Sequence, residues 1–281
     1  MTTACIVTLT TSLSLYFIAS VLLHVSFVIR KNRWREYGRY LIIAGLTIQI
    51  FGMFLHAFLS SSSPFSNMLV IVSWLVIIIL TTALLAERFT EIRYLIFLAT
   101  PLGFVALLYP LLMPVEFKES EMILLRFPWL GAHFALTLFG YVGQALAFCT
   151  AITYILQENK LKRGTLNQYL PALDTAAKAT FYFASAGFFC FSLGLSMGLI
   201  WYFDAPGEFL HGRDLKIWMA IPTWVLFGIY LYRRGIHRDH SGNLKWLIII
   251  GFLSAMINLV GIRHDYVRQY FPNKIDNQTI K

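Results

Sequence analysis

The chain has 281 residues, of which 58% are hydrophobic and only 13% are charged, and its mean hydropathy is +0.65. A soluble domain of this length has no interior for so much apolar surface, so the composition excludes an ordinary soluble enzyme or binding module. The net charge of +9 does not indicate nucleic-acid binding, because the basic residues lie between long apolar stretches, where membrane topology accounts for them.

Eight apolar stretches match the length of about 20 residues that a helix needs to cross the hydrocarbon layer. The seventh stretch is the shortest and has the least distinct ends. The sequence therefore predicts an all-α integral membrane protein with about eight transmembrane helices, forming one polytopic membrane domain over residues 1–281. The expected spans are Leu9–Ile29, Tyr40–Ser60, Asn67–Ala86, Leu95–Met113, Leu130–Leu156, Phe181–Trp201, Ile217–Tyr232 and Trp246–Ile262.

The basic residues predict the orientation of the spans. Loops that follow odd-numbered spans hold 15 Lys and Arg residues, against 8 on the other side. By the positive-inside rule the odd loops face the cytoplasm and both termini face outward, which puts the loop Asp204–Lys216 on the outer face. We expect the first cytoplasmic turn, RKNRWREYGR, to contact anionic lipid. We also expect a short helix from Pro171 in the third cytoplasmic link.

Histidine is the remaining ionisable candidate at depth, because the expected spans contain no Asp, Glu, Lys or Arg. His133 near the start of the fifth span and His264 just after the eighth are expected at the same outer depth on different helices. Two facing imidazoles commonly hold haem iron. Capping of helix ends and contact with lipid headgroups remain open alternatives. His24 and His56 are expected at opposite depths of the first two spans, which argues against a shared ligand pair.

Three separated segments share a family resemblance: PFSNMLVIVSW (Pro64–Trp74), WLGAHFALTLFGYVGQALAF (Trp129–Phe148) and GFLSAMINLVGIRH (Gly251–His264). They resemble the cytochrome c assembly protein family of haem-handling membrane proteins, which includes the CcsA, ResC and CcmC branches and the related HemX and YpjD branch. The resemblance implies that His133 and His264 are axial ligands of a non-covalently bound haem b. Some relatives carry two transmembrane histidines, which makes His24 and His56 candidates for a haem relay.

The stretch Gly198–Arg234 aligns without a gap with the tryptophan-rich haem-binding loop of that family. The central motif W.WDPKE of the family reads Leu-His-Gly-Arg-Asp-Leu-Lys here, at Leu210–Lys216, which indicates a divergent branch near HemX and YpjD. The resemblance places Trp201 and Trp218 around the haem. By charge complementarity, candidates to meet the propionates are Arg126, Arg213 and Arg263, although each also fits a plain surface charge. The matching positions are Trp201, Gly207, Trp218, Thr223, Trp224, Ile229, Tyr230, Leu231 and Arg234.

The expected function is to hold or deliver haem at the outer face of the bacterial cytoplasmic membrane during cytochrome c biogenesis. The expected partners are a CcsB/ResB-like membrane subunit and apocytochrome c, with no nucleic acid. The outer loops offer no nucleophile and base pair, so we expect presentation of haem rather than bond-making catalysis. Two alternatives stay open: a HemX-like regulatory membrane protein of tetrapyrrole synthesis, and a structural subunit of a membrane assembly complex that binds no haem.

Overall fold

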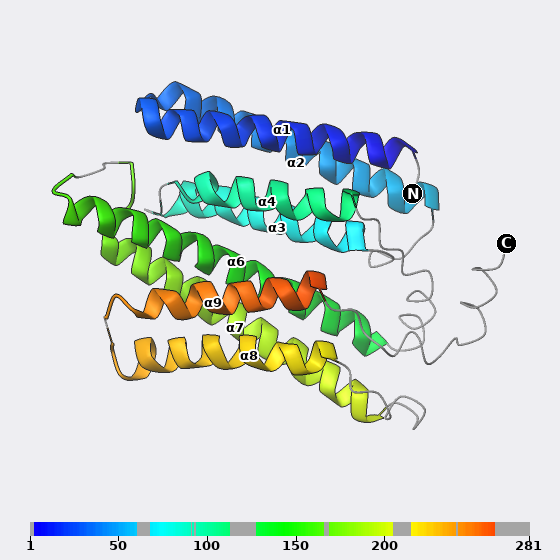
Figure 1. The fold of residues 1–281 in the computed structure, drawn as a ribbon. Coiled ribbons are helices and arrows are strands. Elements are labelled where there is room, and N and C mark those ends of the chain that lie inside the picture. The colour runs from blue at the N-terminus through cyan, green and yellow to red at the C-terminus, as the bar shows by residue number, and fades with distance from the viewer. Residues whose placement is uncertain are drawn as a thin grey trace. The chain divides into compact units, whose positions relative to one another are not determined.

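A computed structural model describes residues 3–60, 68–90, 92, 94–112, 128–165, 169–204, 215–239 and 241–261. Eight helices within these ranges are long and apolar enough to cross a membrane, so the all-α multi-pass fold is confirmed. The short seventh span is among them, at Leu215–Ile236. The helical elements, drawn in Figure 1, are α1 (Thr3–Ile29), α2 (Asn32–Ser60), α3 (Met68–Phe89), α4 (Leu95–Leu112), α6 (Pro128–Lys162), α7 (Leu173–Asp204), α8 (Leu215–Leu231), the π-helical turn η2 (Tyr232–Ile236), α9 (Leu244–Met256) and the π-helical turn η3 (Ile257–Gly261).

Three helices extend well beyond the apolar spans that the sequence suggested. Helix α2 begins at Asn32, α6 continues to Lys162 and α7 begins at Leu173. The expected short helix from Pro171 is therefore wrong, because the chain enters the long helix α7 directly. Ion pairs between side chains four residues apart stabilise the polar extensions: Lys162 with Glu158 at 3.1 Å, and Lys178 with Asp174 at 2.6 Å.

The chain forms two compact units. Unit 1 comprises Met1–Glu121 and Cys149–Thr180, and unit 2 comprises Met122–Phe148 and Phe181–Lys281. Helices α6 and α7 each contribute residues to both units. The expectation of a single membrane domain over residues 1–281 stays a prediction.

Helices α1 and α2 of unit 1 pack as an antiparallel pair through a heptad pattern. Three glycines of α2, spaced seven residues apart, lie against side chains of α1, and a Cβ atom at Gly45 would approach Tyr16 Cε1 to 2.6 Å. Small residues at these positions allow the two backbones to come close, which is a common way to pack helices in membranes. The glycines and their partners are Gly38 with Leu23, Gly45 with Tyr16, and Gly52 with Thr8.

A buried chain of hydrogen bonds links α1, α2 and α3 in the same unit. The Tyr16 hydroxyl donates to Gln49 Oε1 at 2.7 Å, and Gln49 Nε2 donates to the Ser73 carbonyl at 3.2 Å. All three residues are fully buried. Water is absent from the hydrocarbon layer, so internal hydrogen bonds of this kind fix the relative depth of the helices.

At one end of unit 1, an ion pair joins α2 to the end of α3, and a hydrogen bond links α3 to the start of α4. Arg35 Nη2 donates to Glu87 Oε2 at 2.8 Å, while Glu87 Oε1 accepts the Ile96 backbone N–H at 3.0 Å. The Glu87 side chain is only 1% exposed, and the Arg35 guanidinium also lies 4.5 Å from the ring centroid of Tyr94. Tyr94 has a backbone φ of 64°, a left-handed conformation that costs free energy in a non-glycine residue and that surrounding contacts must maintain.

Candidate functional site

The contact between α6 and α7 in unit 2 is built on glycines. A Cβ atom added to Gly143 would lie 2.6 Å from the backbone nitrogen of Gly187, so the two backbones touch where neither residue has a side chain. On the side of this contact toward His133, a glycine of one helix packs against a larger residue of the other helix at two further positions. Direct backbone contact fixes the distance between the two helices. The pairs in order are Gly143 with Gly187, Gly140 with Phe191, and Gly194 with Thr137.

This contact ends at His133. A Cβ atom at Gly198 would lie 2.8 Å from Cε1 and 2.9 Å from Nδ1 of the imidazole, so only glycine leaves room for the ring. His133 Nδ1 is 2.7 Å from the carbonyl oxygen of Gly194. A carbonyl oxygen can only accept, so Nδ1 carries the proton in this bond and the neutral ring has its lone pair at Nε2. Histidines that bind metals are commonly oriented by the same kind of hydrogen bond.

Four helix ends of unit 2 share the end at which His133 lies: the start of α6, the end of α7, the start of α8 and the end of η3 (Figure 1). Asn258 in η3 is buried against the start of α8. With its amide oriented to suit its neighbours, Asn258 donates to the Lys216 carbonyl at 3.3 Å and accepts from the Ala220 N–H at 3.2 Å. These bonds hold the last helical turn of the described chain against the start of α8.

The tryptophans of α8 have different environments. Trp224 Nε1 donates to Ser192 Oγ at 2.9 Å, and its ring packs against Phe188 of α7 with a centroid distance of 5.4 Å. Trp218, by contrast, is 63% exposed. Trp224 therefore ties α8 to α7, whereas Trp218 presents its indole to the surroundings.

Several predicted site residues lie outside the part of the chain that the structure describes. These are His264, the three candidate arginines Arg126, Arg213 and Arg263, and the side chain of Trp201, whose backbone lies in the last turn of α7. Most of the loop Asp204–Lys216 is likewise outside the described residues. Of the proposed ligand pair, the structure therefore describes His133.

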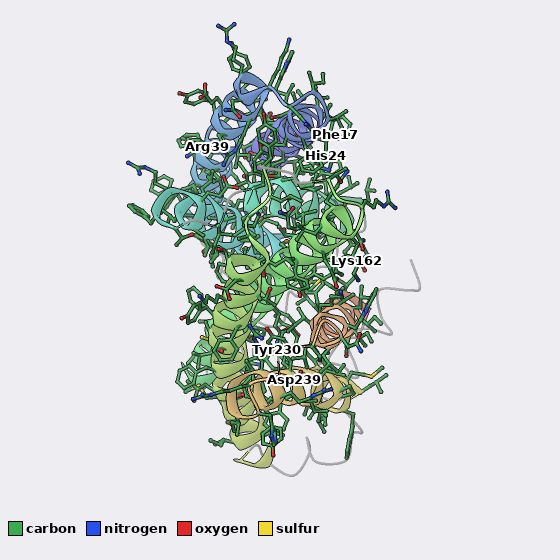
Figure 2. The ribbon with its side chains drawn as sticks, turned by 90° about the vertical axis from the view of Figure 1, so that its left-hand side faces the viewer. Phe17, His24, Arg39, Lys162, Tyr230 and Asp239 are labelled. Carbon is green, nitrogen blue, oxygen red and sulfur yellow. The ribbon has the colours of Figure 1, made fainter. Side chains whose placement is uncertain are left out.

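The two histidines of the first helix pair do not come together. His24 lies near the end of α1 and His56 near the end of α2, and the two helices are antiparallel, which agrees with the expected opposite depths. The ring of His24, which is labelled in Figure 2, packs on Phe97 with a centroid distance of 4.2 Å. Its Nδ1 lies 2.8 Å from the Ser20 carbonyl oxygen. His56 is buried, with 5% of its surface exposed.

Sequence reasoning missed Gly194 and Gly198, the two residues that orient His133. A signal was present, because glycines four residues apart share one face of a helix and are typical of close helix contacts in membranes. The sequence did not indicate which helix would meet that face.

Comparisons with known proteins identify the family. The model of the Cytochrome C assembly protein family matches residues 62–265, a range that includes both His133 and His264. The cytochrome c biogenesis protein CcsA of Cyanidium caldarium is 24% identical over 180 residues, which cover 54% of this chain and 59% of that protein. CcsA of Acorus calamus is 35% identical over 88 residues, which cover 29% and 27%.

The fold also matches a solved structure, that of the cytochrome c haem lyase CcmF. The TM-score is 0.69 at 12% sequence identity, and the match covers 97% of this chain and 49% of CcmF. The matched region thus covers at most 59% of the length of each protein named here. The family model matches well over half of this chain, and the chain therefore belongs to the cytochrome c assembly protein family.

Proposed function

We propose that this protein holds haem at the outer face of the membrane and takes part in cytochrome c biogenesis, with His133 and His264 as the axial ligands. The observation that carries the proposal is the hydrogen bond from His133 Nδ1 to the Gly194 carbonyl. Family membership supports it, because the matched relatives are named as cytochrome c biogenesis proteins.

The Nε2 lone pair of His133 is suited to bind haem iron. A neutral imidazole with its lone pair at Nε2 is a common axial ligand, and a hydrogen bond at Nδ1 raises its basicity and fixes its orientation. Haem would supply an iron centre that accepts two such nitrogens. The residues of this chain supply the orientation: Gly194 through its carbonyl oxygen, and Gly198 through the space that it leaves beside the ring.

The described helices leave enough chain for the two ligands to reach one depth. Phe148 of α6 stacks on Phe252 of α9, with a centroid distance of 4.4 Å. From that contact, helical rise takes α6 about 22 Å to His133 and takes α9 and η3 about 13 Å in the same direction to Gly261. His264 is the third residue after Gly261, and three residues of chain reach at most about 10 Å. The chain length is therefore sufficient for both imidazoles to reach one level.

The remaining parts of the proposal rest on the family alone. Haem b would be bound without covalent attachment, Arg213 and the exposed Trp218 would lie near it, and His24 with His56 would form a separate relay. We propose a CcsB/ResB-like subunit and apocytochrome c as partners, and the bacterial cytoplasmic membrane as the location. Co-purification of a tagged protein from fractionated membranes tests the partners and the location together.

Absorption spectroscopy tests the ligand assignment. Protein purified from cells supplied with haem, and protein titrated with haem afterwards, should both show a Soret band. The variants His133→Ala and His264→Ala should each lose or shift this band. His237→Ala is the matched control, because His237 is exposed at the opposite end of unit 2 and should keep the spectrum.

Two outcomes would contradict the proposal. One is a wild-type protein that stays colourless after haem titration, and the other is a Soret band that both ligand variants retain unchanged. Thermal unfolding of each variant, compared with wild type, separates loss of haem from loss of fold.

A further inference from the structure

About the first two and a half turns of α2 exceed the length that a bilayer requires. Helix α2 has 29 residues and is therefore about 43 Å long, whereas the hydrocarbon layer is about 30 Å thick. The surplus corresponds to the stretch from Asn32 to Tyr40, which the sequence suggested was part of a compact turn. The connection from α1 is reduced to Arg30 and Lys31. The basic stretch is thus the rigid start of a helix and not a loop.

The side chains of this stretch combine outward aromatic rings with outward basic groups. Trp34, Tyr37 and Tyr40 are 38%, 55% and 69% exposed, and Arg33 is exposed beside them. Tryptophan and tyrosine favour the boundary between hydrocarbon and headgroups, because each joins an apolar ring to a polar group. Rings at this level hold the neighbouring basic groups at the depth of lipid phosphates.

Hydrogen bonds fix the backbone of the connecting turn. The Tyr169 hydroxyl donates to the Arg30 carbonyl at 2.6 Å, and the Ser26 hydroxyl donates to the Lys31 carbonyl at 3.1 Å. Arg30 has a φ of 58°, a left-handed conformation that lets the chain reverse between α1 and α2. Both bonds use backbone oxygens, so the charged side chains of Arg30 and Lys31 are not part of them and both residues are exposed.

Among the described residues, ion pairs neutralise only one of the basic side chains of this stretch. Arg35 turns inward to Glu87 and is neutralised there. Within the described ranges, no carboxylate forms an ion pair with the other four basic residues, and the stretch itself contains one acidic residue, the exposed Glu36. The four basic residues are Arg30, Lys31, Arg33 and Arg39, the last of which is labelled in Figure 2.

From these observations we propose that the α1–α2 turn is a binding site for the headgroup of an anionic phospholipid. The phosphate is held by Arg30, Lys31 and Arg33, while Trp34 and Tyr37 pack against the headgroup and glycerol region. A fixed cationic turn at phosphate depth binds anionic lipid more tightly than a mobile loop of equal charge, because less conformational entropy is lost on binding. The site belongs to unit 1 and is independent of the haem proposal.

Lipid titration of the purified full-length protein, followed by native mass spectrometry, tests the site. The probes are phosphatidylglycerol and phosphatidylcholine. The test variant is Arg30→Gln/Lys31→Gln/Arg33→Gln. The control variant is Lys160→Gln/Lys162→Gln/Arg163→Gln, which removes the same charge from exposed residues at the end of α6 in the same unit.

If the site binds anionic lipid, the wild-type protein and the control variant should retain phosphatidylglycerol in preference to phosphatidylcholine. Each basic side chain near a membrane surface contributes about fivefold to binding, so the test variant should bind phosphatidylglycerol roughly a hundredfold more weakly. Unfolding temperatures measured in nanodiscs of the two lipids should show a gain in phosphatidylglycerol that the test variant loses. Equal losses in test and control variants, or no preference in wild type, would overturn the proposal.

Discussion

The α1–α2 pair of unit 1 and the α6–α7 pair of unit 2 use glycine differently. In α1–α2, Gly38 and Gly45 face the side chains of Leu23 and Tyr16, whose contacting atoms lie beyond Cβ and can shift. In α6–α7 the central glycines Gly143 and Gly187 bring backbone against backbone, which cannot yield without moving a helix. The α1–α2 contact can therefore accept a small added group, whereas the α6–α7 contact fixes the distance between the two helices. A fixed distance is what an imidazole at the end of the contact requires if it is to keep one orientation.

The largest effect should come from Gly143→Ala. Its Cβ atom would meet the Gly187 backbone, so the helices must separate, and we expect a loss of about 3 kcal/mol in the free energy of unfolding. Thermal and denaturant unfolding in detergent measure it. Gly131→Ala on the same helix has no heavy atom within 4 Å of the new Cβ and should be close to neutral. Similar losses of unfolding free energy in the two variants would show that the Gly143–Gly187 contact does not fix the distance between α6 and α7.

Gly45→Ala should cost less, about 1 to 2 kcal/mol. The new Cβ would press on the Tyr16 ring at 2.6 Å, and the ring can move only by straining its hydrogen bond to Gln49. The same unfolding assay applies. A cost equal to or above that of Gly143→Ala would show that the two helix pairs do not differ in tolerance.

Tyr16→Phe should have a smaller effect, about 1 kcal/mol. It removes the hydroxyl and leaves Gln49 Oε1 without its donor, but hydrogen bonds between helices in membranes are individually modest. If the buried chain of hydrogen bonds sets helix depth, Gln49→Leu in the Tyr16→Phe background should add little further loss. Fully additive losses would indicate that the two residues act separately.

Gly198→Ala should change stability least, yet it should change the site. The added methyl group displaces the His133 ring from the Gly194 carbonyl, and loss of such an orienting bond lowers metal affinity by about tenfold or more. Haem titration followed at the Soret band measures this. Unchanged haem affinity would mean that the hydrogen bond at Nδ1 does not prepare the ligand.

The number, position and apolar character of the spans could be predicted from the sequence, because hydrocarbon thickness sets helix length directly. The polar extensions of α2, α6 and α7 could not, since hydropathy marks where a helix leaves the hydrocarbon and not where it ends. His133 was proposed as a ligand from its expected depth and from family resemblance, and this stays a prediction. Gly194 and Gly198 were missed, because glycine on a helix face shows its role only when the opposing helix is known.

The most direct test of the central claim is chemical replacement of the His133 side chain. His133→Gly removes the imidazole and opens space beside Gly198, and free imidazole in solution can then take the place of the side chain. If His133 ligates haem, the variant should lose the wild-type Soret spectrum and regain it on addition of imidazole. A His133→Gly variant that shows the wild-type haem spectrum without imidazole would contradict the account.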